Sequence, residues 1–170
     1  MPFTPFHLGP ALAIGFPLRE LIHAPTFTVA NVILDIEPFL VLLLGLGYPL
    51  HGFTHTFFLA FLVGLGLGYM SYLFEGFLSP LYRVILLESS KKLKMRSFLI
   101  AGVLGAMLHV LFDSPLYDDI HPFYPLTINP LYDPSLTLYT YLACVWMGIF
   151  AIIYYILSVA LKTYRRHVSR

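Results

Sequence analysis

A histidine and an aspartate stand one helical turn apart inside an apolar stretch, in the order His109-Val-Leu-Phe-Asp113. A helix places residues i and i+4 on the same face, so both side chains can reach one ion. Imidazole nitrogen and carboxylate oxygen are ligands that suit zinc, and also manganese or iron. The same pair is also typical of a hydrogen-bonded helix end, so the spacing alone leaves a metal site and a structural pair open.

Two more histidines, His51 and His55, occur in the sequence HGFTH. They stand at the start of residues 53–74, which contain no Asp, Glu, Lys or Arg. Ionisable side chains at the edge of a membrane-spanning segment are costly, and they tend to mark function. HGFTH is therefore a second candidate for metal binding.

Three further positions extend the candidate set. The sequence LDIEP contains Asp35 and Glu37, and Pro38 is expected to break a helix there and to expose both carboxylates at a turn. An early histidine, His7, precedes the first apolar run, and His121 follows the HxxxD motif by a few residues. The chemistry thus requires several distant segments to meet at one place.

The elements that must position these residues are apolar. Hydrophobic residues make up 58% of the chain and charged residues 11%, against roughly 25% charged residues in ordinary soluble domains. Residues 53–74 and 138–161 are long enough to cross a bilayer as helices, whereas 97–112 is shorter and needs a tilt or help from neighbours. The sequence predicts an all-α integral membrane helical bundle with three longer transmembrane helices.

Shorter helices are expected near the N-terminus, because the apolar runs 11–18, 27–34 and 38–50 are each too short to cross alone. They could be paired half-helices, interfacial helices or a re-entrant segment. The first residues lack the basic region of a secretory signal peptide. With no linker rich in Gly or Ser, residues 1–170 are expected to form one membrane-embedded domain, and the single Cys144 excludes an internal disulfide.

The basic residues predict the orientation in the membrane. Nine of the ten lie in or near two clusters, one between the second and third long runs and one at the C-terminus. By the positive-inside rule both clusters face the cytoplasm. The loop 113–137 and the end of each helix that carries the candidate histidines then lie outside the cell, so the site is expected to be extracytoplasmic. The basic clusters also suit attraction to anionic lipid headgroups, and nucleic acid is not expected as a partner.

In their order along the chain, the motifs around His7, Asp35–Glu37, Gly52–His55 and the pair His109 and Asp113 resemble the YdjM family of predicted membrane-bound metal-dependent hydrolases. The resemblance spans residues 7 to about 125 and leaves out the last long run. A more distant similarity is to the all-helical zinc-dependent phospholipase C and single-strand nuclease group. Both resemblances imply a divalent metal, zinc first with manganese and iron as alternatives, and a hydrolase. The more distant one implies hydrolysis of a phosphoester.

The resemblance also implies roles for individual residues. The implied metal ligands are Asp35, His55, His109 and Asp113, with His7 and His121 as additions. A carboxylate that orients the attacking water, Asp35 or Glu37, is the implied catalytic residue, although Glu37 could equally be a ligand or a turn residue.

The chain departs from the family pattern at two places. Leu50 and His51 stand where the family has His and Arg, and Glu37 stands where it has a second Asp. His51 is therefore expected to contact substrate or an outer carboxylate rather than the metal ion.

Together these features predict a membrane-bound metal-dependent hydrolase that acts on a lipid headgroup, a lipid-linked phosphate or a water-soluble phosphoester. The alternative is a non-enzymatic membrane protein whose metal site is structural or part of a transport path. A transporter, however, is expected to place polar residues at the bilayer midplane, and the middles of 53–74 and 138–161 hold few. A family member that keeps the fold without the chemistry is a third possibility.

Overall fold

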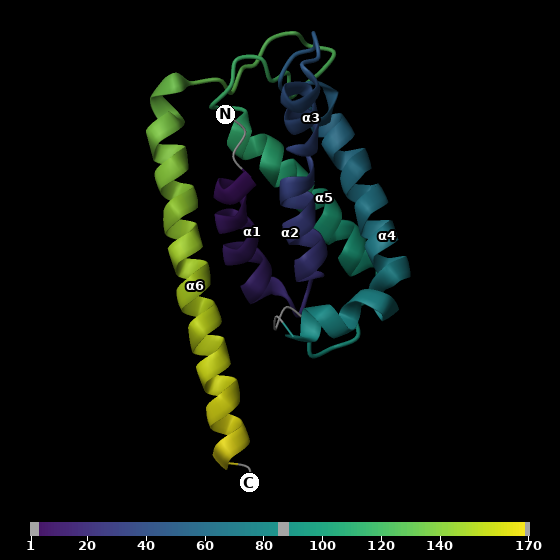
Figure 1. The fold of residues 1–170 in the computed structure, drawn as a ribbon, viewed down its shortest axis with the longest axis vertical. Coiled ribbons are helices and arrows are strands. Elements are labelled where there is room, and N and C mark those ends of the chain that lie inside the picture. The colour runs from purple at the N-terminus through teal and green to yellow at the C-terminus, as the bar shows by residue number, and fades with distance from the viewer. Residues whose placement is uncertain (1–3, 85–88, 169–170) are drawn as a thin grey trace.

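The structure, a computed structural model, describes residues 4–84 and 89–168. Within these residues all regular secondary structure is helical, as predicted, and the helices form a bundle (Figure 1). The α-helices are α1 (Thr4–Leu18), α2 (Ala24–Ile33), α3 (Ile36–Leu44), α4 (Phe57–Val84), α5 (Met95–Asp113) and α6 (Thr137–Val168), and two 3-10 turns are η1 (Phe53–His55) and η2 (Pro134–Leu136).

Four segments are long and apolar enough to cross a membrane: Ala24–Leu44, Phe57–Val84, Met95–Asp113 and Pro134–Tyr164. Three of them correspond to the three longer predicted helices, although the span that corresponds to 53–74 begins only at Phe57. The fourth joins α2 and α3, so two of the three short runs predicted near the N-terminus, 27–34 and the first part of 38–50, lie in the two halves of one candidate span. The remaining run, 11–18, lies in α1.

The junction between α2 and α3 brings an acidic residue into the bundle. Pro38 lies in the first turn of α3, where its missing N–H costs no intrahelical hydrogen bond. The predicted break is present, but the predicted exposure of Asp35 is wrong, because its side chain is only 5% exposed. The reason is tertiary, since the break lies inside the bundle rather than at its surface.

Close packing of α4 on α5 holds the centre of the bundle. A Cβ atom added to Gly64 would lie 2.5 Å from the carbonyl oxygen of Gly102, and one added to Gly68 would lie 2.6 Å from that of Phe98. Only glycine permits this approach of the two backbones. These glycines therefore let the two helices pack closely together.

The start of α4 lies four residues later than the apolar run suggests. Residues Phe53–His55 form η1, and Thr56 accepts a hydrogen bond from Leu59 N at 3.2 Å, which caps the helix. At its other end α4 continues to Val84 and contains Pro80, a residue type that kinks helices, and the ribbon of α4 bends toward this end (Figure 1). The turn η1 ends at His55, whose side chain is fully buried.

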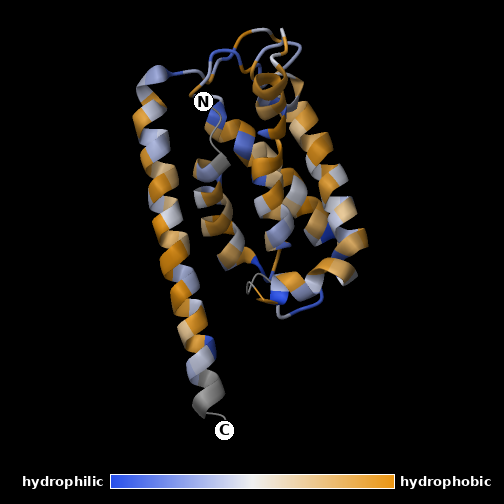
Figure 2. Ribbon diagram, in the orientation of Figure 1, coloured by the Kyte–Doolittle hydropathy of each residue, from blue (hydrophilic) through white to orange (hydrophobic). Residues whose placement is uncertain are grey.

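The outermost helix, α6, packs on α1 and exposes apolar side chains along its length. Trp146 is 66% exposed and Ile152 is 60% exposed. Figure 2 shows the same apolar colouring on the outward surfaces of α4 and α6. Apolar surface this extensive is typical of helices that face lipid, so the architecture is that of a membrane protein.

Candidate metal centre

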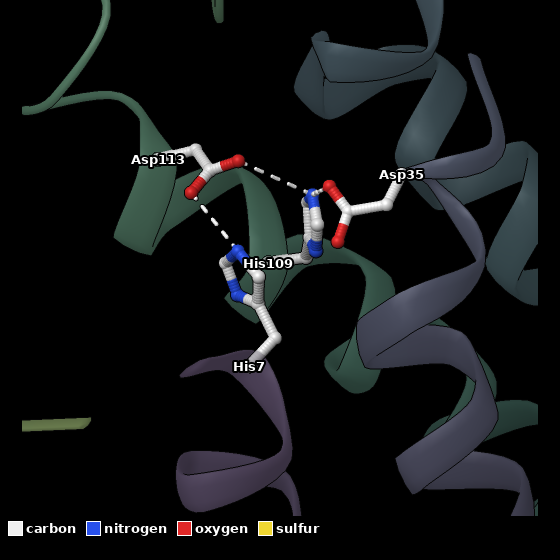
Figure 3. Close-up of side chains that lie close together, drawn as sticks. All are labelled: His7, Asp35, His109 and Asp113. Atoms are coloured by element: carbon white, nitrogen blue, oxygen red, sulfur yellow. Dashed lines mark ion pairs between the residues drawn. The ribbon is translucent and has the colours of Figure 1, made fainter. Parts of the chain in front are cut away.

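Four predicted ligands meet inside the bundle, near the end that carries the N-terminus and the loop after α5 (Figure 1). His7 comes from α1, Asp35 from the α2–α3 junction, and His109 and Asp113 from the last turns of α5 (Figure 3). One potential ligand atom of each lies within 4.8 Å of those of the others, and all four side chains are buried. The structure therefore brings together residues that are far apart in the sequence.

A second group shares one of these residues. The second group consists of His51 and His55, from the segment before α4, and Asp113. One potential ligand atom of each lies within 4.8 Å of those of the other two, and both histidines are buried. The two groups touch directly, because His55 Nε2 is 3.2 Å from His109 Nε2. Both groups could hold a metal ion, with the carboxylate of Asp113 between them.

The backbone fixes the proton of His109. Its Nδ1 lies 2.9 Å from the carbonyl oxygen of Asn31, which can only accept a hydrogen bond. Nδ1 therefore carries the proton, and in the neutral ring the lone pair is on Nε2. The side-chain amide of Asn31 in turn donates to the carbonyl oxygen of Gly105 at 3.1 Å, which ties α2 to α5 beside the imidazole.

A carboxylate orients His55 in the same way. Its Nδ1 lies 3.3 Å from Glu37 Oε2, an oxygen that also accepts hydrogen bonds from the backbone N–H and the hydroxyl of Thr54. With its proton held toward Glu37, His55 presents the lone pair of Nε2 to the cluster. Burial lowers the pKa of His55, so this ring is neutral near pH 7.

Two imidazole lone pairs thus face each other across 3.2 Å, and a carboxylate joins them. Asp113 Oδ2 lies 3.4 Å from His109 Nε2 and 3.9 Å from His55 Nε2. This oxygen is buried and accepts no hydrogen bond from the described residues. Such an arrangement of electron pairs is repulsive unless a proton on one Nε2 or a metal cation lies among them. Nitrogen and oxygen donors in this combination fit a divalent metal such as zinc, manganese or iron.

His7 closes the cluster on the side of α1. Its Nε2 is 3.0 Å from Asp113 Oδ1, and its ring stacks on His109 with 4.0 Å between centroids. The position of α1 is fixed by Gly9, since a Cβ atom there would overlap the backbone carbonyl of Cys144 on α6. A glycine contact with the outer helix therefore positions a candidate ligand.

The other predicted site residues lie around this cluster. Glu37 belongs to neither group of potential ligands and contacts His55 instead. His51 is hydrogen-bonded to the carboxylate of Asp119. Its ring Nδ1 lies 2.8 Å from Asp119 Oδ1, and its backbone N–H donates to Asp119 Oδ2 at 3.1 Å. His121 is in neither group, so its role as a metal ligand stays a prediction.

Three residues of the site were not predicted from the sequence as site residues. Asn31, Thr54 and Asp119 hold the imidazoles of His109, His55 and His51, and none is a potential metal ligand in the two groups. Asn31 had a detectable feature, because it is a lone amide in the apolar run TVANVIL. The other two stand in polar segments, where their partners depend on how the loops fold.

A small cavity adjoins the cluster between α1, α5 and α6. Its volume is about 10 Å³, which is about the space for one water molecule. The lining includes His7, Asp113, Tyr117, Tyr141 and Cys144. Burial raises the pKa of Tyr117, so its phenol keeps its proton and can donate a hydrogen bond.

The geometry of the cluster suits a metal ion. The potential ligands are buried, and Asn31 and Glu37 hold the Nδ1 protons of His109 and His55 away from the centre of the cluster. A water-sized cavity is lined by two potential ligands, His7 and Asp113. No family model, curated protein or solved structure matches the chain.

Proposed function

We propose that the protein is a membrane-bound metal-dependent hydrolase that cleaves a phosphoester, either in a lipid headgroup or in a lipid-linked phosphate, at the extracytoplasmic membrane surface. The observation that carries the proposal is the convergence of His55 Nε2, His109 Nε2 and the carboxylate of Asp113 in a buried space. The order of the motifs along the chain, which resembles that of the YdjM family, supports the same reaction class.

In this proposal Asp35, His55, His109 and Asp113 hold the metal, with His7 as a fifth donor. A divalent ion supplies Lewis acidity and lowers the pKa of a water molecule toward neutrality. Asn31 and Glu37 orient the imidazoles. The carboxylate of Asp35, whose Oδ1 lies 3.7 Å from His109 Nε2, would bind the ion through one oxygen and accept a proton from water through the other.

The surroundings favour a substrate at a membrane surface. The loops before α4 and after α5 lie over the cluster and are tied together by His51 and Asp119. Their exposed apolar side chains include Phe53, Phe123 and Tyr124. Aromatic residues of this kind are enriched where a membrane meets water, so a substrate that resides in the bilayer can approach the site without leaving the interface.

The test is metal content and phosphodiesterase activity of the full-length protein in detergent, after repletion with zinc or manganese. We expect the wild type to carry metal and to hydrolyse bis-(p-nitrophenyl) phosphate or a phospholipid, and His109→Ala with Asp113→Asn to lose both properties. Asp118→Asn is the matched control, because Asp118 is an exposed carboxylate outside both groups. Equal, negligible metal in all three proteins would refute the metal site and the hydrolase together.

A structural metal site is the second candidate, and the burial of the ligands favours it. None of His7, Asp35, His109 and Asp113 is more than 5% exposed, and structural zinc sites have no open coordination position. A wild type that binds zinc, becomes more stable with it and hydrolyses neither substrate would support this candidate. Metal-dependent hydrolysis that is lost with Asp35→Asn while metal is retained would exclude it.

A further inference from the structure

A larger cavity lies at the opposite end of the bundle, near the start of α5. Its volume is about 500 Å³, which is in the range of small-molecule sites. It is lined by α4, by α5 and by the loop 89–93, and the lining includes His23, Tyr72, Glu75, Gly76, Lys91 and Lys92. None of these residues belongs to the metal cluster.

The inner wall of this cavity is aromatic and carries one carboxylate. His23 stacks on Phe98 with 4.1 Å between ring centroids, and Tyr72 meets Phe98 edge-on at 5.5 Å. Because His23 Nδ1 accepts a hydrogen bond from Thr26 N at 3.3 Å, its proton is on Nε2, which lies 3.1 Å from Glu75 Oε2. Burial lowers the pKa of His23 to about 4, so the pair is a neutral imidazole on a carboxylate.

The rim is basic and is held in place. Glu20 accepts hydrogen bonds from Ser89 Oγ at 3.1 Å, Ser90 N at 3.1 Å and Ser90 Oγ at 2.7 Å. These bonds fix the loop that carries Lys91 and Lys92, whose side chains are exposed. The two ammonium groups outweigh the one carboxylate of Glu75 in the lining, so the cavity favours an anion with a single negative charge.

On the side of α4 the cavity borders open space and apolar surface. A Cβ atom added to Gly76 meets nothing within 4 Å, and the next residue, Phe77, is 82% exposed. A ligand can therefore place a charged group at the lysines and an apolar part along α4. A phosphodiester joined to acyl chains has this distribution of charge and apolar surface.

We propose that this cavity binds the phosphodiester headgroup of an anionic phospholipid, with the phosphate at Lys91 and Lys92 and the glycerol against Tyr72 and Gly76. General attraction of lysines to an anionic membrane needs no cavity. The proposal is more specific, because it requires both the charge of two lysines and the space beside one glycine.

The space is tested by Gly76→Leu, which fills the opening of the cavity without a change of charge. The matched control is Gly66→Leu, because Gly66 is on the same helix, is also exposed and also has no atom within 4 Å of an added Cβ, but does not line the cavity. Native mass spectrometry of the full-length protein in detergent, with phosphatidylglycerol or phosphatidylcholine of the same acyl chains, measures the binding. We expect wild type and Gly66→Leu to prefer phosphatidylglycerol, and Gly76→Leu to lose that preference.

The charge is tested by Lys91→Gln with Lys92→Gln, against Lys94→Gln as the control outside the lining. Removing one lysine near an anionic headgroup is expected to weaken binding about 5-fold, and removing both about 25-fold. Lys94→Gln is expected to change it little. Equal weakening by Lys94→Gln, or by Gly66→Leu, would show diffuse attraction to the surface and would overturn the proposal.

Competition with inorganic phosphate distinguishes a lipid headgroup from a free phosphate anion as the ligand of the cavity. Phosphatidylglycerol binding that persists in millimolar phosphate supports a lipid as the occupant. Displacement of the lipid by phosphate at that concentration would overturn it in favour of a free anion. The melting temperature and the helical circular dichroism of each variant identify any variant that fails to fold. If Gly76→Leu does not fold, the lysine variants decide whether the cavity binds the lipid, because they change only exposed side chains.

Discussion

At the scale of single residues, the chemistry of the cluster depends on which nitrogen of each imidazole carries the proton. Asn31 and Glu37 hold the Nδ1 protons of His109 and His55, and this turns both Nε2 lone pairs toward Asp113. In metal sites such outer hydrogen bonds set the tautomer and the orientation of the ligand. A residue that never touches the ion can therefore control how tightly it is bound.

The substitution Glu37→Gln tests this control. The neutral amide is a weaker partner for His55 Nδ1–H than the carboxylate, so zinc affinity is expected to fall about 10- to 100-fold with no loss of helix content. Competition with a chromophoric chelator measures the affinity, and Asp118→Asn serves as the control for removing an acidic charge. Unchanged affinity would show that Glu37 has no influence on the metal. Complete loss would instead identify it as a ligand.

At the scale of elements, the sequence predicted the long helices better than it predicted how the short ones combine. Apolar runs and their lengths located α4, α5 and α6, because the bilayer imposes a minimum span. Run length left the pairing of α2 with α3 as one of three alternatives, since Asp35 interrupts the apolar pattern at their junction. Its burial depends on α5, whose His109 lies 3.7 Å from Asp35 Oδ1.

The candidate site was predictable to a similar degree. Residue type and position identified His55, His109 and Asp113, because such side chains are rare in apolar segments. The partners Asn31 and Asp119 were not, since ordinary polar residues become specific only when the chain has folded around them. Contacts between loops, such as that of His51 with Asp119, carry no periodicity from which they could be predicted.

The contact of α4 with α5 leads to a prediction about stability. Gly64→Ala places a methyl group 2.5 Å from the carbonyl oxygen of Gly102 and 2.7 Å from the Cα atom of Val103, so the two helices must separate. Overpacking of this kind typically costs about 1–3 kcal/mol, and a lower melting temperature in detergent is expected. Gly66→Ala on the same helix has open space and is expected to be neutral or slightly stabilising. Equal melting temperatures for the two variants would contradict the close approach of α4 and α5.

At the scale of the whole molecule, the two cavities and the charges are segregated along the helices. The metal cluster lies where α5 ends, and the basic loop with Lys91 and Lys92 lies where α5 begins. Figure 1 shows these two ends of α5 at opposite ends of the bundle. If α5 crosses the membrane, the two sites face opposite sides of it, and the positive-inside rule assigns the lysines to the cytoplasm.

That orientation predicts the outcome of thiol labelling in intact cells. In a protein whose buried Cys144 is replaced by alanine, Asp118→Cys is expected to react with a membrane-impermeant maleimide from outside. Lys92→Cys is expected to react only after the membrane is permeabilised, because α5 separates the two positions. The cysteine-free parent controls for background. Labelling of both positions from one side would mean that α5 does not cross, whereas exchanged accessibility would keep the span but move the metal cluster to the cytoplasmic face. The second result would redirect the search for a substrate from extracytoplasmic lipids to those of the inner leaflet.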